Sequence, residues 1–90
     1  MSELLRLRDE IEEIDRSLIA LIARRVQLAR EVGNVKRAQG LPTLDPAREA
    51  AIIRRAVTLA RENGLAEEDV RDIFWHLVGL SRRAQLESEP

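Results

Sequence analysis

The feature that most constrains this chain is a seam of apolar residues from Leu4 to Val35, which no proline interrupts. The seam residues are spaced by three and four positions, which places their side chains along one face of an α-helix, as in a coiled coil. Leu, Ile, Ala, Arg and Glu, which favour helix, dominate this segment. The sequence therefore predicts one helix over residues 3–38. Its seam comprises Leu4, Leu7, Ile11, Ile14, Leu18, Leu21, Leu28, Val32 and Val35.

A helix of this extent is too long for a single small core. It would measure about 54 Å at 1.5 Å per residue. A compact globule of 90 residues has a radius of gyration of only about 12 Å. Since small chains commonly complete their cores by oligomerising, we expect this chain to pair with a second copy of itself.

A second helix is predicted by its start and stop signals. Gly40 and Pro42 end the first helix. Asp45 followed by Pro46 is typical of a new helix, with an N-cap and then a proline at the first helical position. The second helix should run to about residue 62, with an apolar side formed by Ile52, Ile53, Ala56, Leu59 and Ala60.

A third helix is expected over residues 67–86, after a break at Asn63-Gly64. No segment shows the alternation of a strand. The expected architecture is therefore all-α, with a three-helix protomer in a single domain over residues 1–90 and a frayed tail or linker at 87–90. The apolar stripe of the third helix comprises Val70, Ile73, Phe74, Leu77, Val78 and Ala84.

Composition excludes several classes of function. Fifteen basic and sixteen acidic residues are interspersed and give a net charge of −1, which argues against nucleic acid and acidic membranes as partners. No apolar run is long enough to span a membrane, and the charged N-terminus is unlike a secretory signal, so we expect a cytoplasmic protein. The absence of cysteine and the single histidine, His76, argue against disulfides, thiol chemistry and a metal site.

The informative charges lie where helical periodicity calls for apolar residues. Arg25 occupies a seam position, where a charge is costly unless it is paired or meets a ligand. Either a buried ion pair or a polar residue that sets helix register would account for it without a ligand. Lys36 and Arg8 flank the same seam, and each alone is better read as a solvated edge charge.

Polar residues also extend the apolar faces of the two shorter helices. Ser81 and Gln85 are four positions apart and continue the stripe of the third helix, and a buried glutamine needs partners at both ends of its amide. Arg48 and Glu49 fall in the first turn of the second helix. There they could be ordinary first-turn charges, and Glu49 suits the helix dipole.

Helical geometry limits how these cations can combine. Arg25 and Lys36 are separated by about 16 Å along the helix axis, so their long side chains could hold a small dianion between them. Arg8 is about 25 Å from Arg25, so it could join them only from another chain. A cation-rich pocket suits a dicarboxylate. Ser81 lacks an obvious base, since His76 points differently, and this favours charge stabilisation and conformational restraint over covalent catalysis.

The chain resembles the AroQ class of all-helical chorismate mutases. The matching pieces, in order, are LRDEIEEIDRSLIALIARR, LAREVGNVK, LPTLDPAREAAII and SRRAQ, and together they cover residues 4–86. The resemblance implies an intertwined homodimer with two equivalent sites. It also implies the Claisen rearrangement of chorismate to prephenate, in phenylalanine and tyrosine biosynthesis, without cofactor or metal.

The resemblance also implies roles for individual residues. Lys36 and Gln85 would hydrogen-bond the ether oxygen of the breaking C–O bond. Glu49 would hold the substrate hydroxyl, with help from the backbone at Asp45. The carboxylates would be bound by Arg25 and by Arg8 of the second chain, which acts in trans, with support from Arg48 and Ser81. Lys36, Gln85 and Arg25 would be the catalytic residues.

Three other functions remain open at this stage. The chain could be a mutase or regulatory domain of a larger aromatic-pathway enzyme, which a tail at residues 88–90 would suit. It could be a lyase that cleaves isochorismate to pyruvate and salicylate, although the VGNVK and DPARE segments are closer to the mutases. It could also be a non-catalytic helical interaction module. Such a module would have no reason to keep Arg25, Lys36 and Gln85 on apolar faces.

Overall fold

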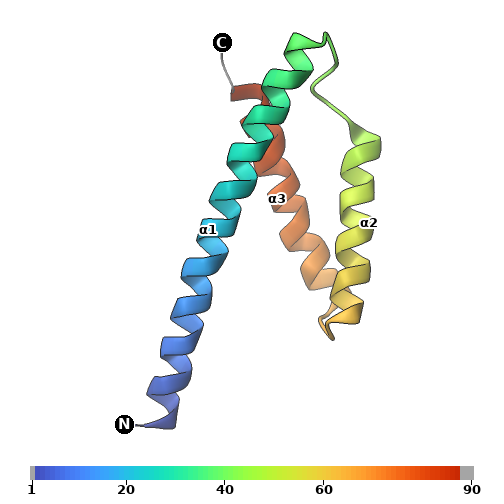
Figure 1. The fold of residues 1–90 in the computed structure, drawn as a ribbon. Coiled ribbons are helices and arrows are strands. Elements are labelled where there is room, and N and C mark those ends of the chain that lie inside the picture. Colours follow the sequence, from blue (N-terminus) through green and yellow to red (C-terminus); the bar gives the residue numbers. More distant parts are fainter. Residues whose placement is uncertain (1, 88–90) are drawn as a thin grey trace.

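The computed structural model describes residues 2–87, which form three α-helices and no strand (Figure 1). Helix α1 spans Glu3–Ala38, α2 spans Pro46–Glu62 and α3 spans Glu67–Glu87. The predicted all-α class is confirmed, and each helix begins and ends within about one residue of its predicted position. Residues 88–90 of the predicted tail lie outside the described part, whereas Glu87 is the last residue of α3.

Helices α1 and α2 are capped by side chains at their starts and followed by glycines. The Ser2 hydroxyl accepts a hydrogen bond from the Leu5 amide at the start of α1, and Asp45 caps α2. Gly40 and Gly64 follow the ends of α1 and α2 with φ angles of 69° and 71°. This left-handed conformation is readily available only to glycine, so both turns depend on these residues.

Helix α3 holds the protomer together. It packs against both α1 and α2, whereas α1 and α2 make no close backbone approach to each other within the described residues (Figure 1). The buried positions are occupied by small or β-branched residues, which let the helices approach closely. Gly33 is one of them, so its place within α1, near the C-terminal end of the helix, reflects helix packing. The buried set is Ala29, Gly33, Ile53, Ala56, Ala60, Val78 and Ala84.

The N-terminal half of α1 extends away from the other two helices (Figure 1). The described residues therefore have an elongated shape, 57 × 28 × 15 Å, with a radius of gyration of 16.5 Å. The apolar seam of this half is uncovered, with Ile14 58% and Leu21 66% exposed. None of the described helices is long and apolar enough to cross a membrane.

Two residues expected on apolar stripes are exposed. Leu59 on α2 and Ile73 on α3 are 48% and 58% exposed, and Leu65 between the two helices is similarly open. They lie toward the α2–α3 turn, which diverges from α1 (Figure 1). The expected stripes were wrong here because only two helices meet at this end of the protomer, and two helices cannot cover both apolar sides.

Candidate functional site

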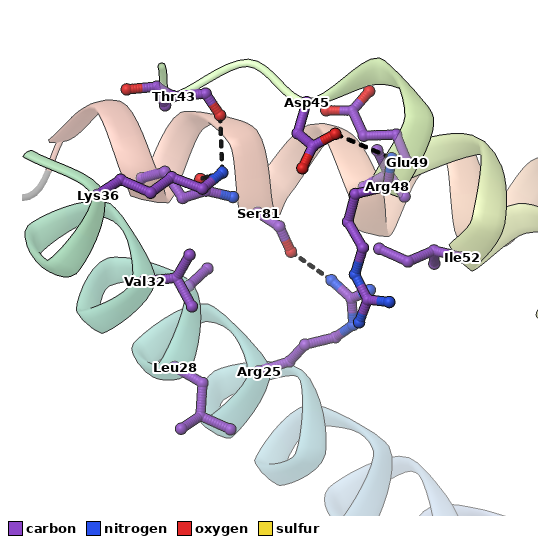
Figure 2. Close-up of a pocket in the computed structure, with 13 residues that line it drawn as sticks. Arg25, Leu28, Val32, Lys36, Thr43, Asp45, Arg48, Glu49, Ile52 and Ser81 are labelled. Carbon is purple, nitrogen blue, oxygen red and sulfur yellow. Dashed lines mark hydrogen bonds between the residues drawn. The ribbon is translucent and has the colours of Figure 1, made fainter. Parts of the chain in front are cut away.

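A cavity of about 390 Å³ lies where the C-terminal half of α1, the start of α2 and the C-terminal part of α3 converge. Figure 2 shows polar side chains from all three helices pointing into this space. Both polar and apolar residues line it. The lining comprises Arg25, Leu28, Ala29, Val32, Lys36, Thr43, Asp45, Arg48, Glu49, Ile52, Val78, Ser81 and Gln85.

Lys36 joins three parts of the chain at one end of the cavity. Its Nζ atom donates to the Thr43 carbonyl oxygen at 2.9 Å and to Gln85 Oε1 at 2.8 Å. The ammonium is therefore fixed between the α1–α2 connector and α3 (Figure 2). Because the Gln85 oxygen accepts from Lys36, the orientation of the amide is set, and its nitrogen can act as a donor. Neither of these partners is a carboxylate, so within residues 2–87 no direct ion pair neutralises the charge of Lys36.

Arg25 lines the cavity from α1 and is half-buried. Its guanidinium donates to the Ser81 hydroxyl and, at 3.4 Å, to the carbonyl oxygen of Leu77. A buried ion pair, one explanation of a charge in the seam, is therefore not what the described residues form. Burial lowers the pKa of Arg25 below its usual value, and the neighbouring cations Arg55 and Arg48 lower it further. A bound anion would relieve this repulsion.

Arg48 and Asp45 bring the start of α2 to the cavity rim. Asp45 Oδ1 accepts a hydrogen bond from the Arg48 amide at 3.1 Å, the contact of an N-cap. The Arg48 side chain then extends toward Arg25, and the two guanidinium groups lie at the centre of the site (Figure 2). The capped first turn of α2 therefore fixes the backbone at the edge of the cavity and places the Arg48 cation in it.

Glu49 lines the cavity from α2 and is only 20% exposed at its side chain. Both of its carboxylate oxygens accept from Arg82 on α3, with Nε–Oε2 at 3.0 Å and Nη2–Oε1 at 2.6 Å. Sequence reasoning missed Arg82, since nothing in its immediate surroundings connects it with a carboxylate 33 positions away.

The remaining polar groups offer no covalent chemistry. The Ser81 hydroxyl accepts from Arg25, and His76 lies exposed on α3, so the two do not form a nucleophile–base pair. No group of three or more His, Cys, Asp or Glu residues that could hold a metal ion occurs between residues 2 and 87. Binding and electrostatic stabilisation are the chemistry that these residues can supply.

The structure brings together all but one of the residues predicted for the site. Arg8 is the exception: it lies exposed on the free half of α1 and does not line the cavity. Within one chain it is about 25 Å along the helix axis from Arg25. The residues that do line the cavity are Arg25, Lys36, Asp45, Arg48, Glu49, Ser81 and Gln85.

This arrangement agrees with the comparison to known families. Residues 7–86 match the family model of chorismate mutase type II, so the chain belongs to that family. A chorismate mutase of Methanocaldococcus jannaschii is 34% identical over 85 residues, which are 94% of this chain and 86% of that protein. A T-protein of Haemophilus influenzae is 38% identical over 74 residues, 82% of this chain.

The relatives differ greatly in length. This chain spans only 20% of the Haemophilus T-protein, and the same share of a second T-protein, from Enterobacter agglomerans. Among solved structures, a conserved hypothetical protein of Pyrococcus furiosus superposes with a TM-score of 0.74 at 31% identity, over 94% of this chain and 99% of that one. The family therefore occurs both as a short chain and as a segment of longer proteins.

Proposed function

We propose that this chain is a chorismate mutase, which converts chorismate to prephenate in the cytoplasm as a step of phenylalanine and tyrosine biosynthesis. The observation that carries the proposal is the cavity itself. Arg25 and Lys36 project into it from one helix and donate to neutral oxygens rather than to carboxylates. Two cations without acidic partners suit a substrate with two carboxylates, and no cofactor or metal is needed for the reaction.

The chemistry would consist of restraint and charge stabilisation. The rearrangement breaks a C–O bond and forms a C–C bond within one molecule, through a folded conformer that is scarce in solution. Carboxylate contacts to Arg25 and Arg48 would select that conformer and so remove much of the entropic part of the barrier. No covalent intermediate is formed.

Lys36 and Gln85 would provide the differential stabilisation. Negative charge grows on the ether oxygen as the C–O bond breaks, and donors aimed at that atom stabilise the transition state more than the substrate. Lys36 is held rigidly by its contacts to Thr43 and Gln85, so little reorganisation would be required. Glu49 would accept a hydrogen bond from the substrate hydroxyl, beside the backbone of Asp45, and Ser81 would support a carboxylate with Arg48.

We further propose that the chain acts as a homodimer, in which the free half of α1 covers the site of the second copy. The uncovered seam supports this, because water-exposed leucine and isoleucine side chains on a helix gain free energy by burial. Such a pairing would carry Arg8 to the cavity of the other chain, where it would bind the second substrate carboxylate.

The direct test is to mix the purified chain with chorismate and follow the loss of its ultraviolet absorbance. We expect activity in the wild type and near-complete loss in Arg25→Ala with helicity retained. Arg24→Ala is the matched control, since it removes a neighbouring exposed arginine that does not line the cavity. An inactive wild type, or a fully active Arg25→Ala, would refute the proposal.

Action in trans has its own test. Arg8→Ala and Arg25→Ala homodimers should each be inactive, but mixing them should restore part of the activity. The heterodimer would contain one site that lacks both arginines and one intact site. If mixed and separately assayed proteins have the same summed activity, Arg8 does not act in trans.

Gln85 makes a prediction for pH. A neutral amide donates at any pH, so kcat/KM should vary little from about pH 5 to 9. A carboxyl in its place would donate only when protonated. Gln85→Glu should therefore lose activity as the pH rises, and a steep loss above about pH 6 in the wild type would contradict the assigned role.

A second proposal follows from the length comparison: the chain functions as the mutase segment of a larger assembly or fusion. The T-protein relatives, of which it spans 20%, support this. Sequencing a full-length transcript would test it directly. A short transcript, together with full activity of the isolated chain, would favour the self-contained enzyme.

A further inference from the structure

The ion pair between Glu49 and Arg82 has no role in the function proposed so far. Glu49 lines the cavity, whereas Arg82 does not and contacts the carboxylate from the α3 side. Two N–H groups donate to two oxygens, which fixes the plane of the carboxylate as well as its position. The pair also links α2 to α3 next to Ser81.

Glu49 poses an electrostatic problem for a site that binds a dianion. The charged side chains that line the cavity are three cations, Arg25, Lys36 and Arg48, and two carboxylates, Asp45 and Glu49. A carboxylate with only 20% of its side chain exposed is weakly screened by water. To accept a hydrogen bond from the substrate hydroxyl, Glu49 must lie close to the substrate. At that short range its negative charge would also repel the substrate carboxylates.

Arg82 has the charge and the geometry to remove that repulsion. Its guanidinium lies against both oxygens of Glu49, with contacts of 3.0 and 2.6 Å. The hydrogen bonds to Glu49, followed by its charge, raise the pKa of Arg82 above its usual value. An arginine is protonated at physiological pH even without this shift. Each carboxylate oxygen has two acceptor directions, so an oxygen that accepts from Arg82 retains capacity for a hydroxyl.

We propose that Arg82 is a positioning residue, which neutralises and orients Glu49 so that this carboxylate can read the substrate hydroxyl without repelling the dianion. The inference rests on the proposed function and deepens it. It assigns to a residue outside the cavity a share in substrate affinity, exerted through Glu49 alone.

A double-mutant cycle on KM for chorismate tests the proposal. Arg82→Met keeps the apolar stem and removes the charge. We expect it to raise KM about tenfold, while kcat changes by less than about threefold, because the lost interaction acts on binding more than on the transition state. In the Glu49→Gln background the same substitution should change KM by less than about twofold, since no charge remains to neutralise.

Two controls separate this role from simple support of the α2–α3 contact. Arg83→Met removes the next arginine of the same helix, which is exposed, and should leave KM unchanged. Arg82→Lys retains the charge and should recover part of the affinity, less than fully because it lacks the bidentate geometry. Circular dichroism and thermal melting of each variant check that the fold is retained.

The outcomes distinguish the inference from the proposed function. An inactive wild type refutes the function and the inference together. An active wild type in which Arg82→Met raises KM equally in both backgrounds, or leaves it unchanged, overturns the inference alone. A tenfold rise that disappears when Glu49 is replaced by glutamine supports both.

Discussion

The two halves of α1 form contrasting environments on one continuous helix. In the N-terminal half the seam is open to water, with Ile14 58% and Leu21 66% exposed, and the charges pair locally, as Arg6 does with Glu3 and Glu10. In the C-terminal half the seam residues Leu28 and Val32 are still 43% and 44% exposed, but Ala29 and Gly33 beside them are buried. There the polar contacts reach across the fold.

The sequence distance of these contacts explains the difference. Pairs at three and four positions along an exposed helix stabilise it by only about 0.2–0.5 kcal/mol each. The contact of Arg25 with Ser81 spans 56 positions, and that of Lys36 with Gln85 spans 49. Such contacts exist only when the helices are correctly packed. The N-terminal half of α1 therefore supplies an uncovered apolar surface, the free half, and the C-terminal half lines the formed site. The predictions below are arranged to test this division.

The largest effect should come from the formed site. Lys36→Ala should lower kcat/KM about 1000-fold, because removing one donor to the charge that develops in a transition state typically has an effect of about this size. Helicity should remain, since the side chain lies at the rim of the cavity. Arg16→Ala, on the exposed face of the free half, is the control and should be fully active. A comparable loss in Arg16→Ala would erase the functional distinction between the two halves.

The free half should instead govern association. Leu18→Glu places a charge in the exposed seam and should weaken dimerisation at least about 100-fold, since a buried unpaired charge costs several kcal/mol. Sedimentation analysis over a range of concentrations would measure this. Arg16→Glu introduces the same group on the opposite face of the helix, two positions or about 200° away, and should leave the mass unchanged. Equal behaviour of the two variants would show that the seam is not an interface.

Helix capping gives a smaller effect in the formed half. Asp45→Ala removes the acceptor of the Arg48 amide and should lower the free energy of unfolding by about 1 kcal/mol, the usual value of an N-cap. Urea denaturation followed by circular dichroism would measure it. Because the cap also orients the first turn of α2 at the cavity, KM should rise in parallel. A stability loss with unchanged KM would separate the cap from the site.

The matching cap of the free half should matter least. Ser2→Ala removes the acceptor of the Leu5 amide at a helix end that is open to water, where Leu4 and Leu5 are 54% and 49% exposed. We expect a loss of about 0.5 kcal/mol, the low end for N-caps, and no change in kcat/KM. If Ser2→Ala lowers the free energy of unfolding more than Asp45→Ala does, the N-terminal end of α1 contributes more to stability than the site does, which would contradict the proposed division.

Local signals sufficed for the helices, and periodicity for much of the site. Gly40, Asp45-Pro46 and Gly64 mark helix ends through backbone physics that needs no tertiary information. Arg25 and Gln85 stood out because they occupy apolar stripes, and the structure places both at the cavity. Arg48 and Glu49 were singled out because they extend the apolar face of the second helix, and the resemblance added the backbone at Asp45.

What escaped prediction depends on how helices meet. The exposure of Leu59 and Ile73 follows from the divergence of the α2–α3 turn from α1, which no local pattern encodes. The contact of Arg82 with Glu49 joins two helices whose relative rotation is set by packing of the whole protomer. The functional roles of the site residues, and that of Arg8 above all, remain predictions.

The open seam of α1 also has a consequence for cellular dosage. In the proposed dimer each site needs residues from two chains, so below the dissociation constant the number of working sites rises with the square of the protein concentration. Folding would follow the same mass action, because association stabilises the folded chain. Halving the protein concentration would then lower the rate of prephenate formation by more than half. Activity would depend on expression more steeply than in proportion.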